Sequence, residues 1–172
     1  MKNNLLIIFF CIFFYNSLFA ERILIESKNI TIDKNSEVSV FKNEVIVKTE
    51  ENNLIKSDYA EYNKIKGFLK LKNNVEAVDK HGNIIKTEFA EYDELKKVFK
   101  SFGPTKILTS KKYVIETEDI IFDDTKKLVS SNKKTNILDQ DDNQISLENF
   151  SYNTINNIFK SIGYIEILDK NE

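Results

Sequence analysis

The chain has 172 residues, with 25 basic and 27 acidic side chains and a net charge of −2 at neutral pH. Its length is typical of one domain. A weakly acidic chain with mixed charges is a poor binder of nucleic acid, so that class of partner is excluded.

Residues 1–20 are predicted to be a secretory signal peptide. Lys2 precedes an apolar run from Leu5 to Tyr15, and Ala20 stands at the expected cleavage position. The run is short for a membrane-spanning helix, which needs about 20 residues, although an uncleaved anchor stays an alternative. Cleavage removes the only cysteine, Cys11, and leaves residues 21–172 as one exported domain without a disulfide framework.

A 30-residue repeat runs through the rest of the chain. Residues 54–62 return with the same spacing at 84–92, 114–122 and 144–152, and a degraded copy stands at 24–32. Three columns recur in these copies: isoleucine (Ile55, Ile85, Ile115, Ile145), acidic (Asp58, Glu88, Glu118, Glu148) and aromatic (Tyr62, Tyr92, Phe122, Tyr152). Such spacing predicts stacked structural units with an atypical unit at the end.

Each repeat holds two strand-like segments joined by turn-rich stretches. The second segment alternates strictly, with Leu69, Leu71, Asn73, Val75 and Ala77 on one face and mostly polar residues on the other. This period predicts a sheet with one buried and one solvated face. The inward column is apolar at both ends and small or polar in the middle. We expect an all-β, antiparallel fold of roughly ten strands in short hairpins, with a local gap in pairing at Pro104.

The first segment of each repeat shows a slip in this alternation. Ile55 and Ser57 share one face, whereas Ala60 and Tyr62 fall on the other, and both pairs recur as apolar or small residues. A one-residue β-bulge at residues 58–59 would turn both pairs inward. We hypothesise that the acidic column accepts hydrogen bonds from the backbone N–H groups that such a bulge leaves free.

The sequence predicts no catalytic residues, no cofactor and no metal site. The single histidine, His81, stands in a glycine-containing turn, where a solvated loop residue is expected. The acidic residues recur once per repeat rather than as the close pairs that hydrolysis needs, and no phosphate loop or nucleotide fingerprint occurs. Four lysine pairs are expected on solvated faces, or near lipid phosphates if they surround a groove: 96–97, 111–112, 126–127 and 133–134.

The order of these features resembles the OstA-like (organic solvent tolerance) domain family of lipopolysaccharide transport, which includes LptA, LptC and the N-terminal domain of LptD. The resemblance covers residues 23–168. It rests on segments 42–47 and 72–75, which are similar to the family's Gly-Asn-Val strands, and on the pattern Leu/Ile-x-x-x-Asp/Glu-x-Ala-x-Tyr at 54–62 and 84–92. Lys42 and Lys72 replace the family's glycine.

This resemblance implies a β-jellyroll or β-taco of four to five two-strand repeats, with a V-shaped groove for the acyl chains of lipid A. Such domains stack end to end by β pairing in the periplasm, with or without attachment to the outer membrane. Acyl chains need apolar walls and gain about 0.8 kcal/mol for each buried CH₂ group, which the inward columns can supply. The predicted groove residues are Ile55, Leu69, Val75, Ala77, Ile85, Phe99, Ile107, Ile115, Val129, Ile137, Ile145 and Phe159.

The predicted function is therefore non-enzymatic: a periplasmic lipopolysaccharide-binding protein that passes lipid A toward the outer membrane. Three alternatives stay open. The chain could be the periplasmic domain of an LptD-like outer-membrane assembly protein, or an LptC-like anchored protein if its leader is retained. It could also be a structural β-solenoid with a filled core and no ligand.

Overall fold

The structure, a computed structural model, describes residues 23–33 and 35–170, so the predicted signal peptide lies outside the described residues. The all-β prediction is confirmed: the described part contains strands and no helix, and the strand pairs are antiparallel. The strands are β1 Ile23–Glu26, β2 Asn29–Asp33, β3 Val38–Thr49, β4 Leu54–Asn63, β5 Phe68–Val78, β6 Ile84–Asp93, β7 Val98–Leu108, β8 Val114–Glu118, β9 Ile121–Asp123, β10 Leu128–Ser131, β11 Thr135–Leu138, β12 Gln144–Leu147, β13 Phe150–Asn153, β14 Ile158–Lys160 and β15 Ile165–Leu168.

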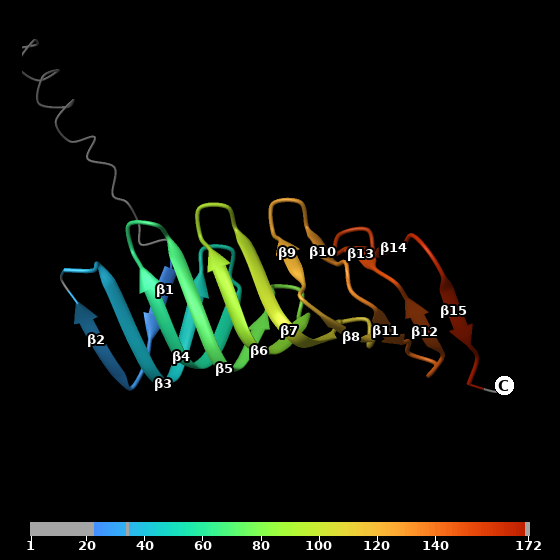
Figure 1. Ribbon diagram of the computed structural model, residues 1–172, viewed down its shortest axis with the longest axis horizontal. Helices are drawn as coiled ribbons and strands as arrows, with labels where there is room; N and C mark the ends of the chain where they lie inside the picture. Colours follow the sequence, from blue (N-terminus) through green and yellow to red (C-terminus); the bar gives the residue numbers. More distant parts are fainter. Residues whose placement is uncertain (1–22, 34, 171–172) are drawn as a thin grey trace, which may run out of the picture.

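The strands follow one another along an elongated sheet (Figure 1). The long strands β3 to β7 pair in chain order, while β1 and β2 both pair with β3, β2 along its first half and β1 along its second. After β7 the sheet forks, with β8, β11, β12 and β15 continuing one half and β9, β10, β13 and β14 the other. The expected number of strands, about ten, was too low because each long strand of this part is divided in two.

A β-bulge occurs at the predicted level of the strands, but its extra residue lies on the second segment of each repeat and not at residues 58–59. The register between β4 and β5 shifts between Lys56 and Tyr59, so that two residues of β4 face three residues of β5. The same shift recurs between β3 and β4, β5 and β6, and β6 and β7. On the partner strands Asn43, Asn73 and Gly103 have φ of 63°, 62° and 78°, a region that asparagine and glycine adopt more readily than other residues.

The bulges turn both halves of each long strand inward. Ser57 and Ala60, on either side of the slip, are both buried. The sheet therefore folds over itself along the line of bulges, here called the bend, into two facing walls. Wall A contains β1, β8, β11, β12, β15 and the halves of β3 to β7 that end at rim A, the loops 50–53, 79–83, 109–113 and 139–143. Wall B contains the other strands and halves, which end at rim B, the turns 64–67, 94–97, 124–127 and 154–157, seen as a row along the top of Figure 1.

Buried hydroxyl groups line the bend, and this explains the small and polar middle of the inward column. They are Ser57, Thr87, Ser101, Thr105, Thr117, Ser131 and Thr135. The Ser57 hydroxyl donates to the carbonyl of Tyr59 at 3.1 Å, and the Ser131 hydroxyl donates to that of Glu118 at 2.6 Å. Backbone groups that leave the β ladder thus find partners without water, as buried polar groups must.

The hypothesis that the acidic column accepts backbone N–H groups at the bulge was wrong for Asp58. Asp58 accepts a hydrogen bond from the side-chain amide of Asn74 at 2.7 Å, not from the backbone. The carboxylate that accepts a backbone N–H at the bend is that of Asp119, beside the column, from Gly103 at 2.8 Å. Serine and threonine hydroxyls make most of the side-chain hydrogen bonds to the backbone at the bend. Their short side chains reach it from inside, where a carboxylate would be desolvated at high cost.

The end of the continuous sheet lies beside Pro104, as predicted. Pro104 has no N–H to donate and pairs with Glu118, the last residue of β8. The next residue, Asp119, has a φ of 51°, and β9 begins two residues later. From this point the bend interrupts each strand instead of being absorbed as a bulge.

The expected inward position Asn73 is exposed, and so is Lys133 two repeats later, because the bend turns both outward. On β15, Ile165 and Ile167 are exposed because this strand lies at the edge of the sheet. The N-terminal half, in contrast, has a filled core. Its best-buried side chains, between 0% and 1% exposed, are Val45, Val47, Leu69, Leu71 and Val75.

The hydroxyl line predicts a stability cost for Thr135→Val. Thr135 is 0% exposed, its hydroxyl lies 2.8 Å from that of Thr117, and it donates to the carbonyl of Lys133 at 3.0 Å. Its removal leaves buried polar groups unpaired and should lower the free energy of unfolding by about 1–3 kcal/mol in urea denaturation. Thr31→Val, on exposed β2, should change it by less than about 0.5 kcal/mol; equal effects of the two changes would contradict the assigned role of the hydroxyl line.

Candidate functional site

A slot lies between the two walls in the middle of the molecule. Its apolar lining comes from both walls: Ile55, Ala77, Val78, Ile85, Tyr92, Phe99, Ile107, Ile115, Phe122, Val129 and Tyr152. The cavity volume of the slot is about 40 Å³, well below the roughly 300–1,000 Å³ found for small-molecule sites, so the slot is nearly closed in this structure. Most of the lining side chains are buried, so the walls stand close together.

The polar residues of the slot all lie at its mouth. They are Thr49, Asn53, Asp79, Asn83, Lys97, Thr109, Asp124 and Thr154, and they belong to the two rims or stand next to them. The slot is therefore apolar in its depth and polar at its opening. This division suits an amphiphilic molecule with an apolar tail and a polar end.

The structure gathers seven of the twelve predicted groove residues around this slot: Ile55, Ala77, Ile85, Phe99, Ile107, Ile115 and Val129. Five lie elsewhere. Leu69 and Val75 belong to the filled N-terminal core, and Ile137 and Ile145 pair with each other on wall A beyond the slot. Phe159 lines a neighbouring pocket.

The sequence prediction missed the aromatic side of the slot. Tyr92, Phe122 and Tyr152 all line it, and they form the aromatic column already visible in the repeat. The parity slip predicts that this column faces inward, so the signal was present. Of the charged residues of the mouth, Lys97 belongs to a lysine pair that was expected on a solvated face or near a groove, whereas Asp124 was not predicted.

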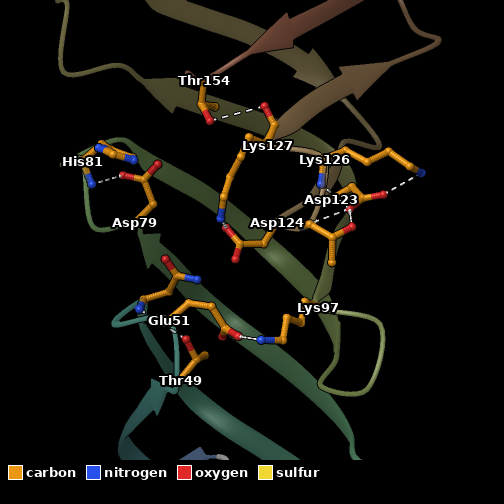
Figure 2. A network of polar contacts seen from close by, with 12 residues as sticks. Thr49, Glu51, Asp79, His81, Lys97, Asp123, Asp124, Lys126, Lys127 and Thr154 are labelled. Carbon is orange, nitrogen blue, oxygen red and sulfur yellow. Dashed lines mark hydrogen bonds and ion pairs between the residues drawn. The ribbon is translucent and has the colours of Figure 1, made fainter. Parts of the chain in front are cut away.

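Rim A is shaped by turn residues that bond to their own loops. The Asp79 carboxylate accepts the N–H groups of His81 at 2.8 Å and Asn83 at 2.9 Å, as shown in part in Figure 2. The equivalent Asp139 accepts those of Asp141 and Asn143. His81 stands on the exposed face of its loop, in agreement with its predicted role as a solvated residue.

Rim B is a ladder of hydrogen bonds from one repeat to the next. Glu94 N–H donates to the Gly67 carbonyl at 2.8 Å, Asp124 N–H to that of Lys97 at 3.0 Å, and Thr154 N–H to that of Lys127 at 2.9 Å. The accepting residues all have positive φ, between 54° and 57°. These bonds hold neighbouring turns in register, so side chains of rim B keep fixed positions at the mouth.

One ion pair bridges the mouth at its N-terminal end. The ammonium of Lys97, on rim B, contacts Glu51 Oε1 on rim A, and it lies 3.7 Å from Glu50 Oε2; Figure 2 shows the first contact crossing between the rims. The Glu51 side chain is only 15% exposed. Burial alone would raise the pKa of Glu51, but the hydrogen bond and charge of Lys97 outweigh it and hold that pKa below its usual value of 4.5.

The ring of Tyr92 lies among these acidic groups. Burial first, and then the charges of Glu51, Asp124 and Glu94, raise the pKa of the Tyr92 hydroxyl above its ordinary value. Tyr92 therefore stays neutral at physiological pH. It gives the slot an aromatic wall and a polar tip that faces the mouth.

Aromatic contacts bridge the mouth at its C-terminal end. Tyr113, on rim A, lies with its ring centroid 5.8 Å from that of Phe159 on wall B. Phe159 in turn stacks on Tyr152 at 4.3 Å and an interplanar angle of 22°. The slot is thus bounded by an ionic contact at one end and an aromatic contact at the other.

Among residues 23–33 and 35–170, no group of three or more histidine, cysteine, aspartate or glutamate side chains is placed to hold a metal ion. That part of the chain also contains no helix long and apolar enough to cross a membrane.

No family model and no curated protein matches this sequence. Among solved structures, the chain shows a similarity to LptH, the LptA-homologous periplasmic component of the lipopolysaccharide transport device of Pseudomonas aeruginosa. The TM-score is 0.40, and the sequences are 14% identical over 86% of this chain and 94% of that chain.

The ionic bridge predicts a pH-dependent effect of Glu51→Gln. Because the folded-state pKa of Glu51 is lowered, its stabilising effect is present above the usual pKa of 4.5 and is lost as the pH falls through the folded value. Urea denaturation should therefore show a less stable variant at pH 7, and the difference from the unchanged protein should shrink as the pH is lowered below 4.5. The control Glu50→Gln changes a carboxylate that is 66% exposed and should have little effect at either pH. An equal loss in both variants would contradict the bridge.

Proposed function

We propose that this protein binds a lipid in the slot, with acyl chains between the walls and the polar headgroup at the mouth, and that it carries lipopolysaccharide through the periplasm. The observation that carries the proposal is the slot itself, which is apolar in depth and polar at its opening. The resemblance of the repeat to OstA-like domains supports the choice of lipopolysaccharide among amphiphiles.

Binding of this kind needs no catalytic group. Each buried CH₂ group contributes about 0.8 kcal/mol without any preferred direction, so flexible chains can shift along apolar walls while staying bound. Release then requires an acceptor of equal or greater affinity. Such an exchange fits a carrier that hands its cargo from one protein to the next.

The walls must separate for acyl chains to enter, and the fork in the sheet provides a way. In the C-terminal half, wall A and wall B are separate ladders, connected by short segments at 119–120, 132–134, 148–149 and 161–164. Few hydrogen bonds of the sheet need to break when these two ladders move apart. We infer that the slot opens from this half, whereas the continuous strands β3 to β7 hold the other half fixed.

Photo-crosslinking tests the slot directly. A benzophenone amino acid at Ala77, which lines the slot and is partly exposed, should give lipopolysaccharide adducts in cells. The same residue at Lys100, on the exposed outer side of wall B, should give none. Adducts at Lys100 and not at Ala77 would contradict the proposal. Adducts at neither position would favour the alternative, a structural repeat protein without a ligand, which the filled N-terminal core also suits.

We further propose that copies or related domains join end to end. The edges at both ends of the sheet carry exposed apolar side chains, including Ile30 and Ile32 on β2 and Ile165 and Ile167 on β15. Unpaired edge strands can pair with another chain. Joining one end to the other would extend both walls, so that neighbouring slots become continuous.

Sedimentation analysis tests this joining. Ile32→Asp and Ile167→Asp place a charge on side chains that are 62% and 65% exposed, so the folded monomer should stay intact while concentration-dependent association is weakened by about tenfold or more, roughly the burial value of one large apolar side chain. The control Leu95→Asp changes a residue of rim B that is 61% exposed and should associate like the unchanged protein. Unaltered association in both edge variants would show that the ends are not the contact.

A further inference from the structure

A second pocket opens at the C-terminal end of the mouth. It is lined by Lys111, Tyr113 and Gln140 from rim A and its neighbourhood, and by Tyr152, Asn157 and Phe159 from the opposite side. Its cavity volume is about 240 Å³. Tyr152 lines both this pocket and the apolar slot, so the two spaces adjoin at its side chain.

The floor of this pocket is aromatic. Phe159 lies between Tyr152, on which it stacks at 4.3 Å, and Tyr113, at 5.8 Å between ring centroids. Tyr113 and Phe159 are partly exposed, so parts of their rings face the pocket. Aromatic rings offer a flat apolar surface with a polar tip.

Hydrogen-bonding groups surround this floor. The Tyr152 hydroxyl donates to Asn157 Oδ1 at 2.7 Å, which fixes the amide and leaves its NH₂ group to donate elsewhere. Gln140, on the facing rim, adds an exposed amide. The pocket therefore combines an apolar floor with several neutral donors and acceptors at its edge.

One uncompensated positive charge stands at the pocket. Lys96 and Lys126 are paired with Asp93 and Asp123 inside their own turns, but within the described part of the chain Lys111 has no ion pair. The acidic residue at the far end of the neighbouring loop, Asp142, is paired with Lys170. The Lys111 ammonium is thus available to an acidic group of a ligand.

These groups match a sugar ring. The C–H face of a pyranose packs on aromatic rings, its hydroxyls bond to amides, and an acidic substituent pairs with an ammonium. An acyl chain cannot form hydrogen bonds with the amides, and a free phosphate has no apolar face to pack on the aromatic floor. We propose that this pocket is a headgroup site for an acidic sugar, and that it belongs to the lipid whose acyl chains occupy the slot; in this sense it rests on the proposed function.

The site gives the cargo a fixed direction. The pocket lies at the C-terminal end of the mouth, whereas the Glu51–Lys97 bridge closes the N-terminal end. The sugar of a bound lipid therefore lies toward β14 and β15, and its chains extend beneath the mouth toward β4 and β6.

Three single-chain amphiphiles with the same dodecyl tail test the site by calorimetry below their critical micelle concentrations. They are dodecyl glucuronide, dodecyl glucoside and octaethylene glycol dodecyl ether, which differ only in the headgroup. The glucoside should bind more tightly than the ether. The glucuronide should bind about threefold more tightly than the glucoside, the value of one exposed ion pair.

Substitutions of two exposed residues of the pocket distinguish the effect of its charge from that of its amides on binding. Lys111→Ala should abolish the preference for the glucuronide over the glucoside, and Gln140→Ala should weaken both glycosides relative to the ether. The matched control is Lys80→Ala, which removes an exposed lysine from the preceding loop of rim A, outside the pocket. It should leave all three affinities unchanged.

The outcomes distinguish the two proposals. Equal affinities for the three amphiphiles, unchanged in the Lys111 and Gln140 variants, would overturn the sugar site and leave the lipid slot standing. Tighter binding of the glucuronide that Lys80→Ala removes as fully as Lys111→Ala would also overturn it, because a general positive surface would then be the cause. No binding of any dodecyl amphiphile would overturn the proposed function itself.

Discussion

The whole structure depends on the bend, where each strand must turn both of its halves toward the same interior. A strand of regular alternation cannot do this, because it presents successive side chains to opposite faces. The bulge opposite Ser57 and Asp58 and its repeats shift the alternation by one residue. Without this shift Tyr62, Tyr92 and the residues that follow them in the aromatic column would face solvent, and no second wall would exist to form a slot.

The bend also sets what each half of the molecule can do. In β3 to β7 the bulge is absorbed and the ladder continues, so the two walls are one sheet and their core is filled by Leu69, Leu71 and Val75. Beyond Pro104 and Asp119 the strands are interrupted, and the walls continue as separate ladders that branch from β7. The same repeat therefore gives a rigid half and a half that can open, and the slot lies where they meet.

Much of the fold could be predicted from the sequence because each structural feature recurs in several copies of the repeat. The 30-residue spacing predicted the stacked hairpins, and the parity slip at residue 58 predicted a bulge at this level of the strands. The sequence could not show that Leu69 and Val75 pack tightly whereas Ile85 and Ile107, on the same face, border the slot. That difference depends on the distance between the walls, which the side chains of both walls set together. The carboxylates were wrongly predicted to bond to the backbone at the bend. The interior of the bend excludes water, so a carboxylate there would be desolvated, and serine and threonine hydroxyls bond to the backbone instead.

The two contacts that bound the slot differ in their physics, and this difference bears on the proposed binding of a lipid. The Glu51–Lys97 bridge is ionic and lies at the mouth, where it competes with water and salt. The contacts of Tyr113 and Tyr152 with Phe159 are apolar and are not weakened by ions. The ionic contact lies in the half that the continuous strands β3 to β7 hold together, whereas the aromatic contacts lie in the half where the two ladders are separate. An anionic headgroup of the proposed cargo would have to displace Glu51 from Lys97 at the first end, but would meet aromatic rings and the Lys111 ammonium at the second. The proposed opening of the C-terminal half and the proposed position of the headgroup there are therefore consistent with each other.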